Sequence, residues 1–201
     1  MMRVALIDHG AGNLHSLTKA LVAAGAEPFL TDDPSQWANA AAIVLPGVGA
    51  FAPAAERLAP IRNAVREVIR AGTPTLGICL GMQLLFEGSD EGAGEGLSVI
   101  AGRVTKLDVT RLPHLGWNSF TEVREPLLER APLEAVYYAH SFACRPSELD
   151  CVTAWSELEG ERFPAIVRQG RVVGVQFHPE KSSRAGLEFL RAFLMEAAAC
   201  A

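Results

Sequence analysis

A cysteine between two glycines is the first feature of this chain that could support chemistry. The string Gly77-Ile78-Cys79-Leu80-Gly81 has the form of a nucleophile elbow, with cysteine in place of serine. In an elbow the glycines leave room for a sharp strand-to-helix turn, and the helix N-terminus favours a thiolate. The N–H group of Leu80 would then face a developing oxyanion. A buried packing cysteine in a glycine-rich turn fits the same five residues equally well.

A nucleophile also needs a base and a group that orients the base. Among five histidines, His178 stands out because it ends an apolar segment, GVQFHPE (174–180), that Pro179 terminates. Glu180 follows closely, so its carboxylate could hold the imidazole in one tautomer at the same sheet edge. A histidine at the end of a strand is common by itself, but its combination with Cys79 favours a Cys–His–Glu triad.

Backbone donors for an oxyanion hole follow another buried segment. LPGVGAF (45–51) comes directly after an apolar run, and its glycine-rich loop would expose N–H groups. The predicted oxyanion hole consists of Gly47, Val48, Gly49 and Leu80. The same loop would also serve as an ordinary turn between a strand and a helix.

A second glycine-rich turn resembles a dinucleotide-binding fingerprint only in part. Gly10-Ala11-Gly12 follows an apolar run, and Asp32 lies at a suitable distance. The third glycine of G-x-G-x-x-G would fall at position 15, which is His15. A tight turn between strand and helix explains both glycines, so we predict no nucleotide site here.

The elements that must position these residues follow a regular alternation. Short apolar runs at 3–8, 41–47 and 73–79 are separated by segments of helical periodicity at 13–25 and 61–72. Strands that alternate with helices predict an open, mostly parallel twisted sheet with helices on both faces.

The second half of the chain has a different pattern. VTAWSEL (152–158) and IVRQGRVVGVQFHP (166–179) read as strands, the latter with a hairpin turn near Gln169-Gly170. A glycine-rich acidic loop is expected at 87–96. A last helix would direct inward the side chains of Leu187, Leu190, Phe193 and Leu194. We therefore predict a single α/β domain over residues 1–201, with an added antiparallel portion.

Composition excludes several classes of protein. Of the 201 residues, 49% are hydrophobic and 20% are charged, which is typical of a globular chain. The formal net charge of −5 argues against a nucleic-acid partner. The uncharged stretch 35–55 contains prolines and glycines, so we do not expect it to span a membrane.

Cysteine usage points to a reducing compartment. The chain has four cysteines but no C-x-x-C pair and no zinc-ligand spacing, so no metal site is expected. The N-terminus reaches Asp8 too soon for a signal-peptide core, and we expect free thiols and a cytoplasmic location. Cys144, Cys151 and Cys200 are interpreted as packing or surface residues.

Several strings resemble class I, or triad-type, glutamine amidotransferases, and the resemblance covers essentially the whole chain. LGICLGMQLL resembles the nucleophile elbow of that family, and GVQFHPE resembles its His-x-Glu signature. Within the family, LPGVGAF, PHLGWNSF, YYAHSF and QFHPEKS are most similar to the glutaminase subunits of histidine biosynthesis.

The resemblance implies glutamine hydrolysis through a cysteine thioester, with Cys79 as nucleophile, His178 as base and acid, and Glu180 as its orienting group. Gln83 would then help to bind the glutamine substrate. Backbone groups of the residues after His140 would contact its α-amino-acid end; these residues are Ser141 and Phe142. No metal or organic cofactor is implied.

The resemblance also implies a heterodimer with a separate (βα)₈-barrel cyclase subunit that consumes the ammonia. The residues expected to face this partner are Gly12, Asn13, Trp117, Tyr138 and Lys181. Two positions depart from the family pattern: His9 stands where a tyrosine is usual, and Leu115 stands where a methionine is frequent. Both departures concern the partner-facing side and leave the triad intact.

Other functions remain open on the sequence. The chain could be the amidotransferase subunit of anthranilate, guanylate or pyridoxal phosphate synthesis, although LPGVGAF and HPEKS resemble those members less well. It could also be a non-catalytic relative or a redox sensor at Cys79. Neither of these last two functions would need His178 and Glu180 placed together.

Overall fold

The computed structural model describes residues 1–7, 14–37 and 40–199. The strands are β1 (Met2–Ile7), β2 (Ala26–Thr31), β3 (Ala42–Leu45), β4 (Thr75–Ile78), β5 (Gly88–Ser89), β6 (Gly102–Lys106), β7 (His114–Val123), β8 (Ala135–His140), β9 (Phe142–Pro146), β10 (Val152–Leu158), β11 (Glu161–Gln169) and β12 (Val172–Val175). The helices are α1 (Leu14–Ala24), α2 (Pro34–Trp37), α3 (Phe51–Leu58), α4 (Arg62–Arg70), α5 (Leu80–Gln83), α6 (Pro126–Arg130) and α7 (Ser183–Ala198). Two 3₁₀ turns are η1 (Leu149–Cys151) and η2 (Pro179–Lys181).

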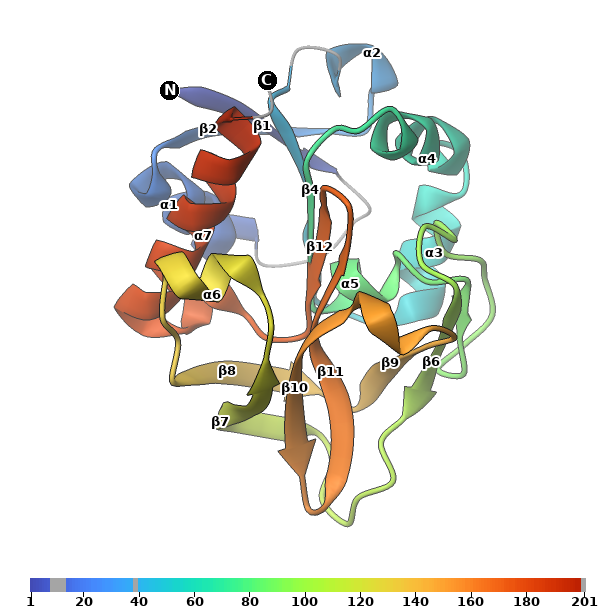
Figure 1. Cartoon of the computed structure of the whole chain (residues 1–201). Coiled ribbons are helices and arrows are strands. Elements are labelled where there is room, and N and C mark those ends of the chain that lie inside the picture. Colours follow the sequence, from blue (N-terminus) through green and yellow to red (C-terminus); the bar gives the residue numbers. More distant parts are fainter. Residues whose placement is uncertain (8–13, 38–39, 200–201) are drawn as a thin grey trace.

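The larger sheet runs in the order β2-β1-β3-β4-β12-β11-β10-β7-β8 (Figure 1). Its strands from β2 to β12 are parallel to one another. The pairs from β12 to β8 are antiparallel. This arrangement confirms the predicted α/β sheet with an added antiparallel portion. It also places β4, which precedes Cys79, directly beside β12, which precedes His178.

The core lies on both faces of the parallel strands. Side chains alternate along β1, so Val4 and Leu6 join one apolar cluster while Ala5 and Ile7 join another. The first cluster contains buried residues of α1 and α7, and the second contains those of α3 and α4. Figure 1 shows these two helix pairs on opposite sides of the sheet, as the alternating sequence pattern predicts.

Two expectations about local structure are corrected. The strand predicted to continue to His178 ends at Val175, and Pro179 opens the turn η2. The chain bends away because the N–H of His178 bonds to the Tyr137 carbonyl on β8, not to β11. The predicted loop at 87–96 contains a short strand, β5, which belongs to a second sheet with β6 and β9.

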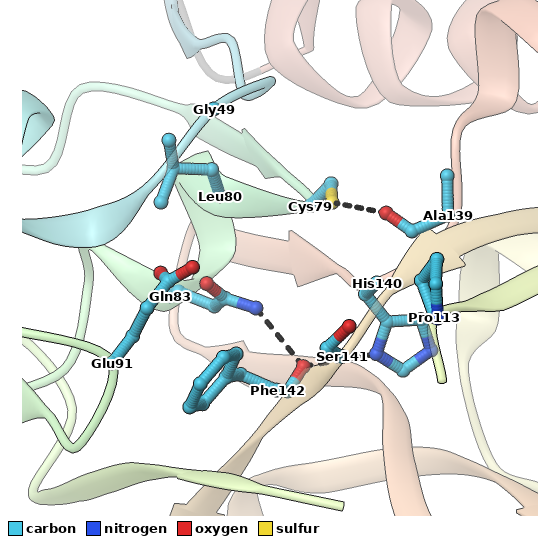
Figure 2. A pocket seen from close by; sticks show the side chains of 10 residues that line it. All are labelled: Gly49, Cys79, Leu80, Gln83, Glu91, Pro113, Ala139, His140, Ser141 and Phe142. Carbon is cyan, nitrogen blue, oxygen red and sulfur yellow. Dashed lines mark hydrogen bonds between the residues drawn. The ribbon is translucent and has the colours of Figure 1, made fainter. Parts of the chain in front are cut away.

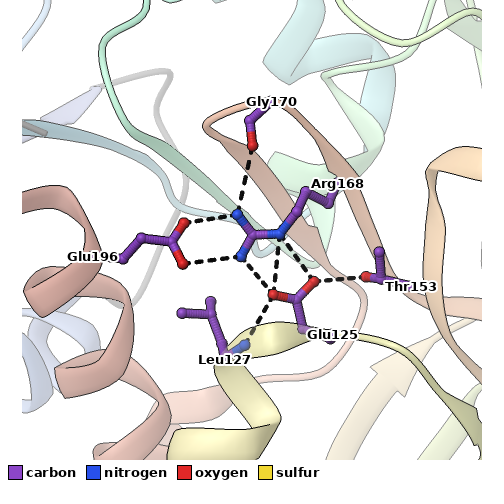
Figure 3. Close-up of polar contacts among 6 residues, drawn as sticks. All are labelled: Glu125, Leu127, Thr153, Arg168, Gly170 and Glu196. Carbon is purple, nitrogen blue, oxygen red and sulfur yellow. Dashed lines mark hydrogen bonds and ion pairs between the residues drawn. The ribbon is translucent and has the colours of Figure 1, made fainter.

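An ionic cluster around the buried Glu125 connects α6 and α7 to the antiparallel strands (Figure 3). The guanidinium of Arg168, on β11, pairs with Glu125 at 2.5 Å and with Glu196, on α7, at 2.7 Å. Glu125 also accepts the N–H of Leu127 at 3.2 Å, which caps α6, and the hydroxyl of Thr153 at 2.7 Å. Since Glu125 is only 1% exposed, Arg168 is needed to neutralise its charge.

No helix within the described residues combines the length and apolar character needed to traverse a lipid bilayer.

Candidate active site

Cys79 occupies a strained turn between β4 and α5. Its φ of 51° and ψ of −107° lie in a region that residues other than glycine rarely adopt. The turn is anchored because the N–H of Cys79 donates to the carbonyl of Val175 on β12 at 2.7 Å. The geometry is that of the predicted elbow, since the thiol lies at the carboxyl end of a parallel strand.

Glycines at three positions permit this turn. A Cβ atom at Gly77 would lie 2.7 Å from the Gly81 carbonyl oxygen, and one at Gly81 would collide with the Leu45 carbonyl oxygen. A Cβ atom at Gly47 would lie 2.5 Å from the backbone nitrogen of Leu80. The segment after β3 therefore packs directly on the elbow backbone, where a side chain cannot fit.

A pocket of about 220 Å³ opens beside the thiol (Figure 2). It is lined by Gly49, Cys79, Leu80, Gln83, Glu91, Pro113, Ala139, His140, Ser141 and Phe142. The structure thus gathers around Cys79 all three predicted substrate contacts. Of the predicted oxyanion-hole residues, Gly49 and Leu80 line the pocket, Gly47 lies buried against the elbow, and Val48 is half-buried.

The predicted base and its carboxylate lie together in the turn after β12. Nδ1 of His178 is 2.8 Å from Oε1 of Glu180, and their side chains are 1% and 7% exposed. Because a carboxylate only accepts, Nδ1 carries the hydrogen and Nε2 is available to Cys79. Burial lowers the pKa of His178, but hydrogen bonds and charges of Cys79 and Glu180 outweigh it and raise the pKa to about 9. The imidazole therefore favours its protonated form beside the sulfur.

The turn that carries this pair is fixed to β8. The N–H of His178 donates to the Tyr137 carbonyl at 2.9 Å, and the N–H of Tyr137 donates to Ser182 Oγ at 2.9 Å. The Ser182 hydroxyl donates in turn to the His178 carbonyl at 2.7 Å. These three bonds form a closed ring, which holds the base at a fixed place relative to the strand that leads into the pocket.

Two buried histidines support the far wall of the pocket. Nδ1 of His140 lies 2.9 Å from the Phe142 carbonyl oxygen, and its Nε2 lies 3.1 Å from Nδ1 of His114. Since a carbonyl only accepts, His140 carries its hydrogen on Nδ1 and accepts from His114 on Nε2. Burial lowers the pKa of His140 to about 3 and also lowers the pKa of His114, so both rings are neutral.

Two site residues were not identified by sequence reasoning. Glu91 brings a carboxylate to the pocket and accepts the N–H of Phe51, at the start of α3, at 2.8 Å. It lies within the acidic loop, where no local pattern distinguishes it from its neighbours. Gln176 donates its side-chain amide to Sγ of Cys79 at 3.6 Å. Gln176 belongs to the GVQFHPE string, but only the contact reveals what its side chain does.

One residue predicted to face the partner, Tyr138, does not lie on the surface. Tyr138 is fully buried, stacks on His114 with ring centroids 4.8 Å apart, and hydrogen-bonds to Ser156 at 2.7 Å. Side chains alternate along β8, so Tyr137 points outward instead. The predicted contacts Trp117 and Lys181 both lie near the Tyr137 ring: the ring centroid of Trp117 is 6.2 Å from that of Tyr137, and Nζ of Lys181 is 5.9 Å from it.

Of the other residues expected at the partner interface, some are exposed on β7 and some lie outside the described part of the chain. Trp117 is 54% exposed, and Leu115, one of the two departures from the family pattern, is 62% exposed. Both lie on β7 and point to the same side of that strand. Gly12 and Asn13, with His9, lie outside the described residues.

Two of the other three cysteines lie within the described residues. Cys144 is fully buried and Cys151 is half-buried, in line with packing or surface roles, while Cys200 lies outside the described residues. Over 1–7, 14–37 and 40–199, no group of three or more His, Cys, Asp or Glu side chains is arranged to hold a metal ion.

A doubly covered α/β sheet with a strained cysteine elbow and an adjoining His–Glu pair defines a class of proteins. The chain belongs to the class-I glutamine amidotransferase family, which matches residues 5–197. Similarity to individual relatives of this chain points to one group within that family. The chain is 43% identical over 196 residues to the imidazole glycerol phosphate synthase subunit HisH of Pyrococcus furiosus, covering 96% of this chain and 98% of that protein. The HisH subunit of Moorella thermoacetica is 44% identical over 199 residues, which covers 96% of this chain and 94% of that protein.

Solved structures show the same fold at lower identity. A crystal structure of a glutamine amidotransferase matches with a TM-score of 0.74 and 22% identity, covering 97% of this chain and 98% of that one. The PurLQS structure from Thermotoga maritima matches with a TM-score of 0.76 and 18% identity, also covering 97% and 98%.

Proposed function

We propose that this chain is the glutaminase subunit of an imidazole glycerol phosphate synthase. It hydrolyses glutamine to glutamate and ammonia and delivers the ammonia to a cyclase subunit, which makes imidazole glycerol phosphate and aminoimidazole-carboxamide ribonucleotide in histidine biosynthesis. The observation that carries this proposal is the strained Cys79 elbow beside the His178–Glu180 pair, at the mouth of a pocket sized for a small molecule. Relatives named as HisH subunits support the pathway.

The first chemical step is attack of the Cys79 thiolate on the side-chain amide carbon of glutamine. The carbonyl oxygen becomes an oxyanion, which the N–H of Leu80 and N–H groups of Gly47, Val48 and Gly49 stabilise. Loss of one such donor typically reduces the rate by about 10²–10³.

The second step uses the proton held on His178. The imidazolium gives this proton to the leaving nitrogen, so the C–N bond breaks, ammonia departs and a thioester remains on Cys79. The neutral imidazole then takes a proton from water, which attacks the thioester and releases glutamate. Glu180 keeps Nδ1 protonated throughout, so Nε2 is the atom that exchanges protons.

The α-amino-acid end of glutamine lies against the wall of the pocket opposite Cys79. The Glu91 carboxylate attracts the α-ammonium group, and the N–H and hydroxyl groups of Ser141 are suited to the α-carboxylate. The amide NH₂ of Gln83 already donates to the Phe142 carbonyl and to Gln176, so its free oxygen accepts from the substrate.

The cyclase subunit that receives the ammonia binds to the β7–β8 face. This face is defined here as Leu115 and Trp117 of β7, Tyr137 of β8 and the adjacent Lys181 of η2. Two exposed apolar side chains beside a lysine and a tyrosine fit a protein partner. We infer a heterodimer with the cyclase subunit, in which the whole chain acts as one amidotransferase domain. We also infer a cytoplasmic location, where this biosynthetic chemistry takes place.

The test measures glutamate release by the full chain, alone and with its cyclase subunit and nucleotide ligand. We expect slow turnover alone and strong stimulation in the complex. Cys79→Ser should abolish glutamine-dependent synthesis and retain synthesis from added ammonia, and Cys151→Ser should retain both. A glutamine-analogue electrophile should label Cys79. Glutamine-dependent activity in Cys79→Ser would refute the proposal, and stimulation by a different synthase instead would reassign the pathway.

A further inference from the structure

Gln176 is a fully buried amide with no role in the triad. It follows β12 directly, and its backbone N–H donates to the Ala165 carbonyl on β11 at 2.9 Å. The preceding residue, Val175, accepts the N–H of Cys79 at 2.7 Å. The backbone on both sides of the elbow thus fixes where the Gln176 side chain begins.

The orientation of the Gln176 amide follows from its neighbours. Gln83 donates from Nε2 to the Phe142 carbonyl at 3.1 Å, and a carbonyl can only accept. The NH₂ group of Gln83 is therefore the end that also faces Gln176, at 3.4 Å, so the atom presented by Gln176 must be its acceptor, Oε1. The remaining end of the Gln176 amide is Nε2, which lies 3.6 Å from Sγ of Cys79.

We propose that Gln176 is a further catalytic residue, whose amide N–H donates to the sulfur of Cys79 and stabilises the attacking thiolate. The inference rests on the proposed function only in treating Cys79 as the nucleophile. It adds to the triad a second hydrogen-bond donor on the sulfur, besides His178.

Two groups that contact the sulfur of Cys79 have opposite effects on the stability of the thiolate. The Ala139 carbonyl oxygen, at 3.8 Å, accepts a hydrogen bond from the neutral S–H group and repels a negative sulfur. The Gln176 N–H acts in the opposite direction, because a donor favours the charged form. Because Gln176 is completely buried, its contact with the sulfur is shielded from solvent water.

The test follows alkylation of Cys79 by iodoacetamide against pH, with the modified peptide quantified by mass spectrometry. In Gln176→Met, which keeps the length of the side chain and removes its donor, we expect the midpoint of the profile to move up by about one pH unit. In Gln176→Glu, which keeps the shape and adds a negative charge, the upward movement should be larger. Gln169→Met, at an exposed position, should leave the profile unchanged.

A second variant separates contact with the sulfur from general loosening of the pocket. Gln83→Met removes the partner of Oε1 but leaves Gln176 its amide N–H, so it should raise the KM for glutamine and move the alkylation midpoint less than Gln176→Met does. An unchanged midpoint in both Gln176 variants would overturn the proposal, as would an equal movement in Gln83→Met. If the midpoint moves in the Gln176 variants while the wild-type protein shows no glutamine turnover, the role of Gln176 is upheld and only the proposed function is refuted.

Discussion

Gln83, on α5, donates its side-chain N–H to the carbonyl oxygen of Phe142 at 3.1 Å across a separation of 59 residues. The same oxygen accepts Nδ1–H of His140 at 2.9 Å (Figure 2). Both lone pairs of this carbonyl are thus occupied by protein donors. The wall of the pocket is therefore arranged before any substrate binds.

His140→Leu should weaken glutamine binding more than it slows the chemistry. The variant removes one donor from the Phe142 carbonyl, so we expect the KM for glutamine to rise about tenfold, equivalent to about 1.4 kcal/mol. The kcat should change by less than about threefold, because His140 does not touch Cys79. Steady-state kinetics of the complex would measure both values.

His140→Asn provides the matched control, because its amide nitrogen can replace Nδ1 as the donor to Phe142. We expect the KM to stay near the wild-type value in this variant. If His140→Asn and His140→Leu are equally impaired, the donor is not the essential feature of this side chain.

Glu180→Gln should change how stability depends on pH. The pKa of His178 is raised from 6.5 to about 9 in the folded protein, so below pH 6.5 both states hold the proton and the ion pair stabilises fully. As pH rises toward 9, the unfolded state has lost its proton and the folded state loses its own, so the stabilisation disappears. The wild type should therefore exceed the variant most at acidic pH, by about 1–2 kcal/mol.

Urea unfolding at several pH values between 6 and 9.5 would measure this difference. Glu188→Gln is a suitable control, since its ion pairs with Arg184 and Arg191 are on the surface. A wild-type advantage that grows with rising pH would contradict the assigned protonation of His178.

Arg168→Met should be strongly destabilising. Glu125 is 1% exposed and would lose its guanidinium partner, and a buried unpaired charge costs about 3–5 kcal/mol. The double variant Glu125→Gln with Arg168→Met should lose less than the sum of the two single variants, because it leaves no buried charge.

Denaturant unfolding would give the free energies for this comparison. The control is Arg184→Met, whose side chain is 91% exposed and lies 3.9 Å from Glu188, and it should have almost no effect. Strict additivity in the double variant would show that the Glu125–Arg168 contact contributes nothing of its own.

Gly47→Ala should impair glutamine hydrolysis selectively. The new Cβ atom would lie 2.5 Å from the Leu80 nitrogen, so the loop or the elbow must move away from the position of the oxyanion. We expect glutaminase activity to fall by at least about 10². Ammonia-dependent synthesis by the complex, measured in parallel, should be retained. A fully active Gly47→Ala variant would place the oxyanion hole elsewhere.

Local patterns account for what the sequence could predict. The elbow glycines, the spacing of His178 and Glu180, and the alternation of apolar runs with helical segments all act over a few residues. They located the parallel strands β1, β3 and β4 and the helices α1 and α4, but not β2 or α3, and they singled out Cys79, His178 and Glu180 as the proposed triad. The hairpin near Gln169-Gly170 was equally readable, because β11 and β12 are neighbours in the sequence.

Contacts between segments that are distant in the sequence could not be predicted from these local patterns. The bend at Gln176 and the end of β12 depend on a bond from His178 to Tyr137, which belongs to another part of the chain. The choice between Tyr137 and Tyr138 as the outward residue depends on which face of β8 meets the core. The role of Glu91 requires knowing that its loop folds against the start of α3.

The ring of hydrogen bonds between Tyr137, His178 and Ser182 has a consequence for solubility. β8 is the last strand of the larger sheet, and the free edge of a terminal strand is a template for pairing with another molecule. At Tyr137 both outward backbone groups are occupied, the N–H by Ser182 and the carbonyl by His178. The turn that carries His178, the proposed base, thus also covers this edge, so we expect a change that loosens the turn to expose unpaired backbone groups of β8 as well as to slow glutamine hydrolysis.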